Sequence, residues 1–273
     1  MRPTRSISSG PIALMLAASL LAVACGGSAS AAPTLAPGAT ATPDSAATPD
    51  SAATPGSSGG VPDGGLAFGG ATSALDALDS YEYNVEIATS ETKAGVETKS
   101  RNVMSGVVVN RPDKASILLM NEYGADDTLE SSTGMLIIGE LAWVRDHETD
   151  PWDSIPLAQA SQFAQIFAAF RPEQMFGLYF AGLGNEFTNA GTESKNGVPS
   201  THFRGGEGIA TIFGAIAGFQ GTWTSDVWLA TDGGYLVHSE AAGEGVNGTD
   251  TGTFRMTVDV SKPNDAGPIE APR

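Results

Sequence analysis

The chain has 273 residues and a formal net charge of −17, with 31 acidic and 14 basic residues. This balance excludes nucleic acid as a partner, because the chain lacks the Lys/Arg surface that phosphate backbones require, and it also disfavours attachment to anionic membranes through charge. The single cysteine, Cys25, excludes an intramolecular disulfide. Stability must therefore come from an apolar core, for which about 200 residues suffice.

Residues 1–24 are predicted to be an export leader. Two arginines precede an apolar run of about 14 residues, which is too short to span a bilayer, since spanning needs about 20. Leu21–Gly26 resembles the lipobox of bacterial lipoproteins, with Ala22 where leucine is usual. The resemblance implies cleavage before Cys25 and its acylation, and two or more acyl chains anchor a protein stably to a membrane. The alternative is an ordinary secretory leader that contains a cysteine.

Cleavage removes two arginines and no acid, which takes the net charge to −19. Residues 25–65 then consist almost entirely of Gly, Ser, Ala, Thr and Pro, with a hexad at 42–47 repeated at 48–53. Such a stretch buries almost nothing apolar, so we expect a disordered tether. The expected location is extracytoplasmic, with Cys25 anchored in the cell membrane, or in an outer membrane if the organism has one.

Residues 66–273 are predicted to form one domain. A short helix is expected at 72–79, with Thr72 or Ser73 as its N-cap. Period-2 alternation and turn residues then predict ten strands, at residues 81–87, 99–109, 114–123, 128–138, 140–146, 186–194, 198–204, 222–230, 235–242 and 253–260.

Three helices are predicted between these strands. The helix at 157–170 has one apolar stripe, a second follows Arg171 and Pro172, and a third spans 208–219. The expected fold is therefore α+β: a single curved antiparallel sheet, a half-barrel of about ten strands, with helices over its concave face.

Several phrases carry a resemblance to a known family. They are Leu75–Tyr81, Asn196–Phe203, Ser225–His238 and Phe254–Asp265. Together they are similar to the LppX/LprG-type lipoproteins of the wider LolA/LolB-like group of lipid and lipoprotein carriers, over 75–272. The resemblance implies a half-barrel closed by helices around an acyl-chain cavity, with no catalytic residues and no cofactor.

Two short strings match motifs of catalytic or nucleotide-binding sites, but neither lies between the strand and helix that such a motif requires. The G-x-S-x-G string at 56–60 lies in the tether, and the G-x-G-x-x-G string at 243–248 joins two strands and opens no helix. The acidic loop at 146–153 could hold a divalent cation, but a solvated loop is the commoner explanation. His202 and His238 are expected to be hydrogen-bonded sheet residues. We therefore expect neither an enzyme nor a metal site.

The predicted function is binding of an acyl lipid or a lipidated ligand in an apolar cavity, for envelope transport or sensing. Strand parity and the helix stripes give the predicted lipid-binding residues: Val85, Ile87, Val107, Ile117, Leu119, Ile137, Trp143, Phe163, Ile166, Phe167, Phe170, Phe176, Ile212, Phe213 and Ile216. Gln159, Gln162, Arg171 and Glu173 could meet a headgroup, although solvated helix faces explain them equally well. The alternative function is a surface-tethered module that binds an envelope protein and no lipid.

The helix at 208–219 is the weakest predicted roof element, because it contains Gly214 and Gly218. Two explanations stay open. These glycines could let the helix open as a gate, in which case alanine would stabilise it, or they could allow close packing on the sheet.

Overall fold

The computed structural model describes residues 64–168 and 171–272. Within them, eleven strands form one open antiparallel sheet in the order β6-β5-β4-β3-β2-β1-β11-β10-β9-β8-β7. The strands are β1 (Ser80–Lys93), β2 (Val96–Val109), β3 (Ala115–Tyr123), β4 (Leu129–Ile138), β5 (Leu141–Arg145), β6 (Asp153–Ile155), β7 (Phe187–Lys195), β8 (Val198–Gly205), β9 (Gln220–Ala230), β10 (Leu236–Asn247) and β11 (Asp250–Ser261).

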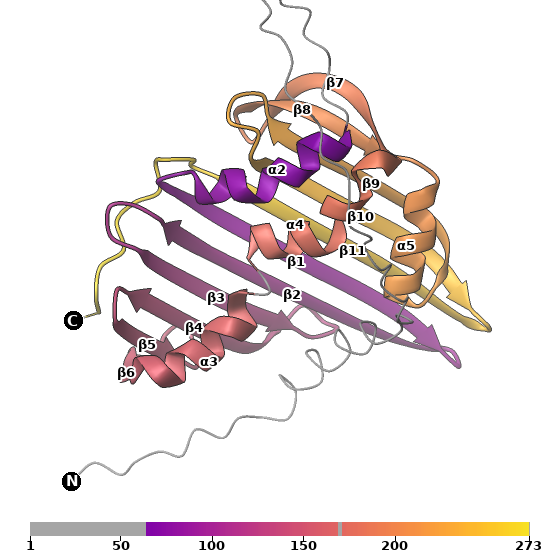
Figure 1. Ribbon diagram of the computed structural model, residues 1–273. Coiled ribbons are helices and arrows are strands. Elements are labelled where there is room, and N and C mark those ends of the chain that lie inside the picture. Colours follow the sequence, from indigo (N-terminus) through magenta and orange to yellow (C-terminus); the bar gives the residue numbers. More distant parts are fainter. Residues whose placement is uncertain (1–63, 169–170, 273) are drawn as a thin grey trace, which may run out of the picture. The chain divides into compact units, whose positions relative to one another are not determined.

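The strand order explains where two helices lie. Strands β1 to β6 form one meander and β7 to β11 another, joined where β1 pairs with β11. The chain must therefore cross from one edge of the sheet, at β6, to the other, at β7. The crossing contains α3 (Leu157–Ala168), α4 (Pro172–Tyr179) and a 3₁₀ turn (Ala181–Glu186), which pass over one face of the sheet (Figure 1).

Two further helices cover the same face. Helix α2 (Gly64–Asp76) packs against α4 and the 3₁₀ turn and contacts β10, while α5 (Gly208–Ala217) packs on β9 (Figure 1). We call this the helix-covered face and the opposite one the open face. None of the described helices combines the length and apolarity that a membrane crossing requires.

The predicted single antiparallel sheet with helices on one face is confirmed, with eleven strands in place of about ten. The short strand β6 was not predicted. Helix α2 begins at Gly64, so Thr72 and Ser73 lie inside it and the predicted N-cap was wrong. The leader, Cys25 and almost all of the predicted tether lie outside the described residues.

The strand register assigns each side chain to a face. Val85 pairs with Met104 and with Val258, and all three are buried in the main core. Paired residues of antiparallel strands share a face, and successive residues alternate. Tyr81, Tyr83, Val85 and Ile87 therefore lie on the helix-covered face.

Candidate functional site

An apolar row runs across the helix-covered face from β1 to β5. In register it comprises Tyr83, Gly106, Leu118, Met135 and Val144. At about 4.8 Å between strands, four spacings make it about 19 Å long. The aliphatic members of the row, with their aliphatic neighbours, form what we call the aliphatic half: Val85, Ile87, Met104, Leu118, Met120, Met135, Ile137 and Val144.

A second part of the core is built around aromatic rings. Phe68 lies 4.9 Å from Phe187, 5.3 Å from Phe176 and 5.4 Å from Phe203, measured between ring centroids. We call the interlocked set the aromatic half: Phe68, Phe176, Phe180, Phe187, Phe203, Phe213 and Trp223. Offset and edge-on contacts of this kind add to the stability that apolar burial provides.

A polar cluster interrupts this core between β1 and the start of α4. The Tyr81 hydroxyl donates to Glu173 Oε2 at 3.0 Å and accepts from Arg171 Nη2 at 3.2 Å. Arg171 Nε lies 2.8 Å from Glu173 Oε1, but this buried N–H is not aligned for a hydrogen bond. Tyr81 is fully buried, and the Glu173 and Arg171 side chains keep 8% and 31% of their surface exposed.

Local structure explains how the sequence positions this cluster. Arg171 is the N-cap of α4 and Pro172 fixes the first turn. Glu173 lies in that turn, where the helix dipole favours a negative charge. Tyr81, 90 residues earlier, reaches the pair because α4 lies over β1 and the neighbouring strands (Figure 1).

The protonation states in the cluster have clear causes. Burial raises the pKa of Tyr81, and the nearby Glu173 carboxylate raises it further. Burial also raises the pKa of Tyr83. Burial alone would lower the pKa of Arg171, because it opposes the charged form. The interactions of the guanidinium with Tyr81 and Glu173 outweigh burial and hold this pKa above its usual value. The cluster therefore offers neutral hydroxyls and a permanently charged guanidinium.

The predicted sheet residues divide between the two faces. Val85, Ile87 and Ile137 lie on the helix-covered face as predicted. The register places the others on the open face, so the parity prediction was wrong for Val107, Ile117, Leu119 and Trp143. Residues on β2 to β4 that the prediction missed replace them: Met104, Leu118, Met120 and Met135.

The predicted helix residues are partly outside what the structure describes. Phe176 and Phe213 are fully buried in the aromatic half, and Ile212 is half-buried. Phe170 and the side chains of Phe163, Ile166, Phe167 and Ile216 are not described. Of the four predicted headgroup contacts, Gln159 is exposed and the side chain of Gln162 is not described, whereas Glu173 is buried and Arg171 half-buried.

The glycines of α5 fit close packing. Gly218 is the C-cap of the helix with φ +77°, in the left-handed region that glycine favours. A Cβ on Gly214 would lie 2.8 Å from the Phe219 carbonyl oxygen. Alanine would therefore introduce strain at both positions, which favours the close-packing explanation of these glycines over the gate.

The two histidines meet on the open face around Trp228. His202 stacks on the Trp228 ring at 4.3 Å and lies 2.6 Å from Asp226, while His238 lies 2.7 Å from Asp259. Burial alone would raise the pKa of Asp259, but the hydrogen bonds from His238 and Asn196 outweigh it and lower that pKa. This network explains both histidines as hydrogen-bonded sheet residues.

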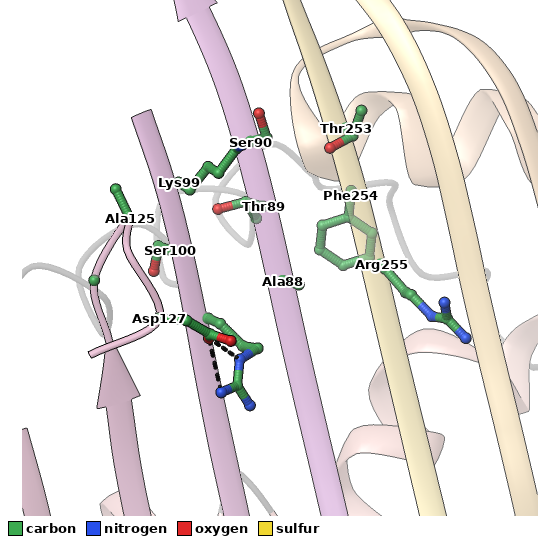
Figure 2. A pocket seen from close by; sticks show the side chains of 12 residues that line it. Ala88, Thr89, Ser90, Lys99, Ser100, Ala125, Asp127, Thr253, Phe254 and Arg255 are labelled. Atoms are coloured by element: carbon green, nitrogen blue, oxygen red, sulfur yellow. Dashed lines mark hydrogen bonds and ion pairs between the residues drawn. The ribbon is translucent and has the colours of Figure 1, made fainter. Parts of the chain in front are cut away.

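The described residues contain no group of three or more His, Cys, Asp or Glu that could hold a metal ion, the acidic loop at 146–153 included. The described residues include two open pockets. One pocket, of about 420 Å³, is lined by residues 88–90 of β1, 99–101 of β2 and 253–255 of β11 (Figure 2). Arg101 pairs there with Asp127, and Lys99 and Arg255 add positive charge. The other, of about 550 Å³, adjoins α5 and Phe219. Of the predicted lipid-binding residues whose side chains the structure describes, none lines either pocket.

The fold and site define an open antiparallel sheet with helices on one face and a polar cluster beneath them. No protein-family model and no curated protein matches the chain. Among solved structures, Mycobacterium tuberculosis lipoprotein LppX is 15% identical and LprF from Mycobacterium bovis 11%, with TM-scores of 0.37 and 0.40. Each match covers 77% of this chain, and 100% of LppX and 96% of LprF.

A LolA superfamily protein from Nitrosomonas europaea is also similar, at 13% identity and a TM-score of 0.20, over 73% of this chain and 94% of that protein. LppX and the LolA superfamily protein belong to the groups that the sequence resembles. At such identities and TM-scores, the likeness carries no conclusion about a ligand.

Proposed function

We propose that this chain is an exported, lipid-anchored protein that binds an acyl lipid or another amphiphile between its helices and the aliphatic half of its sheet, in envelope transport or sensing. The observation that carries this proposal is the apolar row from Tyr83 to Val144, which begins beside the polar cluster of Tyr81, Arg171 and Glu173. An amphiphile needs both parts in one place.

The dimensions support an acyl chain as the ligand. The row is about 19 Å long, and one leaflet of a bilayer contributes about 15 Å of hydrocarbon. Each methylene left in water costs about 0.8 kcal/mol, so a carrier must enclose most of the chain. Methionine suits such a surface because its flexible side chain adapts to the shape of its neighbour, and Met104, Met120 and Met135 all lie there.

The crossing connection would form the roof of the site. Helix α3 contacts β5 at the end of the row, and its Phe163, Ile166 and Phe167, with Phe170, remain predicted ligand contacts. Because the two pockets lie elsewhere, we expect α3 and α4 to move apart when a chain enters. Cys25 would anchor the protein and the tether would let it reach a second surface.

One observation favours the alternative, a protein-binding module without lipid. An apolar row on the open face, which no described helix covers, consists of the half-buried Val107, Ile117 and Trp143 and the buried Leu136. A partner protein could bind there. The two functions therefore place their ligands on opposite faces of the same strands.

Adjacent residues on β3 provide a matched test of the two faces. Met120 and Leu119 are both half-buried, but Met120 lies on the helix-covered face and Leu119 on the open face. The test uses a Cys25→Ser chain, which carries no acyl groups of its own. We expect lipid mass spectrometry to detect co-purified or added acyl lipid, and a fluorescent fatty acid to bind.

In this background Met120→Trp should weaken binding about fiftyfold, because the ring displaces about three methylene groups worth about 2.4 kcal/mol. Leu119→Trp should leave the affinity unchanged. Equal effects of both variants, or no acyl lipid bound by the parent chain, would contradict the proposal.

A further inference from the structure

The polar cluster contains a guanidinium whose hydrogen-bonding capacity the protein uses incompletely. Arg171 Nη2 donates to Tyr81, and the buried Nε lies 2.8 Å from Glu173 without an aligned acceptor. A guanidinium has five N–H donors in a planar fork that matches an oxyanion in two parallel hydrogen bonds. Glu173 therefore occupies the position that an oxyanion would take beside Arg171, but its carboxylate is not aligned to accept a hydrogen bond from Nε.

Packing alone does not account for this arrangement. Replacing a buried ion pair with apolar side chains of similar volume is often neutral or stabilising, because removing the charges from water costs more than their attraction returns. Glu173 and Tyr81 are nonetheless buried beside the half-buried Arg171, in a core that is otherwise mostly apolar. The Arg171 side chain keeps 31% of its surface exposed, so a ligand can approach it from solvent.

We propose that Arg171, with the hydroxyl of Tyr81, is the receptor for an oxyanion headgroup, carboxylate or phosphate, and that Glu173 occupies the headgroup position while the site is empty. This inference rests on the proposed function. The headgroup displaces Glu173 from Arg171 and forms two charge-assisted hydrogen bonds. The N-terminal end of α4 stabilises the added charge as it now stabilises Glu173.

The position of the cluster also gives the ligand a direction. Tyr81 is two residues from Tyr83 on the same strand and face, and their ring centroids lie 6.3 Å apart. A headgroup at Arg171 therefore places the first methylenes of its chain at the β1 end of the apolar row. The chain then runs toward Val144 on β5, over Leu118 and Met135.

The test compares charged and uncharged ligands of the same chain length on the Cys25→Ser protein. The probes are oleate, oleyl phosphate, oleyl alcohol and inorganic phosphate, measured by calorimetry. We expect both oleyl anions to bind about tenfold more tightly than the alcohol, since a hydrogen bond to a charged group contributes that much. Inorganic phosphate alone should not bind detectably. The ratio of oleate to oleyl phosphate affinity identifies the preferred oxyanion.

Three variants locate the effect. Arg171→Gln should remove the anion preference and leave the affinity for the alcohol unchanged. Glu173→Gln should strengthen anion binding several-fold, because it frees the guanidinium. The control is Arg145→Gln, since Arg145 is also half-buried but lies on the open face against Trp152, at 4.5 Å from its ring. It should change neither affinity.

The outcomes separate this inference from the function on which it rests. Equal binding of anion and alcohol, with no effect of Arg171→Gln, overturns the headgroup receptor and leaves the acyl-binding function standing. Weaker anion binding in Glu173→Gln also overturns it, because that result makes Glu173 a positioning partner of Arg171. If no oleyl compound binds, both proposals fail.

Discussion

The aromatic and aliphatic halves share one face of one sheet, but they pack differently. In the aromatic half, Phe68, Phe176, Phe180 and Phe213 have no exposed surface and contact one another through their rings. In the aliphatic half four of the eight residues are buried, and the other four are only partly buried: Ile87, Met120, Ile137 and Val144. The difference indicates a rigid half that holds the fold and an adaptable half that can accept a ligand.

The largest expected effect tests the rigid half. Phe176→Ala should lower the free energy of unfolding by about 3–5 kcal/mol, because it empties a fully buried site among close-packed rings. Met120→Ala should cost about 1–2 kcal/mol, since Met120 is partly buried and its neighbours can adjust. Urea unfolding of both variants measures the difference, and equal losses would remove the distinction between the halves.

The glycines of α5 sharpen the comparison, because they belong to the close-packed half. Gly218→Ala and Gly214→Ala should each destabilise by about 1–2 kcal/mol, through positive φ and through the contact with Phe219 respectively. The control is Gly177→Ala in α4, where the nearest atom to an added Cβ is 3.8 Å away. It should stabilise by about 0.5–1 kcal/mol. Melting curves in which all three variants behave alike would contradict this account.

The smallest expected effect concerns the open face beneath the aromatic half. Asp259 has a lowered pKa in the folded protein, so it stabilises above the pKa of the unfolded chain, and this contribution is lost as pH falls through the folded value. Asp259→Asn should therefore cost about 1 kcal/mol at pH 7, allowing for its partial exposure. Unfolding curves of the two proteins should begin to converge as pH falls below about 4 and coincide only below the folded pKa of Asp259. A difference that does not depend on pH would exclude this cause.

The sequence was enough to predict most of the fold. Ten of the eleven strands were found because alternation and turn residues mark them, whereas β6 has three residues, too few to alternate visibly. The face of each residue was harder to predict. Ile117, Leu118, Leu119 and Met120 are four consecutive apolar residues, so parity on β3 could be set only by its pairing with β2.

The polar cluster shows a second limit of the sequence. Arg171 and Glu173 were candidates for a headgroup contact, but nothing local distinguishes them from residues on a solvated helix. Their partner, Tyr81, is 90 residues before Arg171, and the alternation on β1 predicts only that its side chain lies on the buried face. Only the crossing from β6 to β7, which places α4 over the sheet, brings the three together.

The most direct test of the central claim is where an acyl chain lies. Methionine methyl groups report on it, because Met120 and Met135 lie in the aliphatic half, while Met175 lies in α4 directly before Phe176 of the aromatic half. Doxyl-stearate added to the ¹³C-methyl-methionine-labelled Cys25→Ser chain should broaden Met120 and Met135 first and Met175 last. Broadening that begins at Met175, or that is equal at all three, would contradict the account.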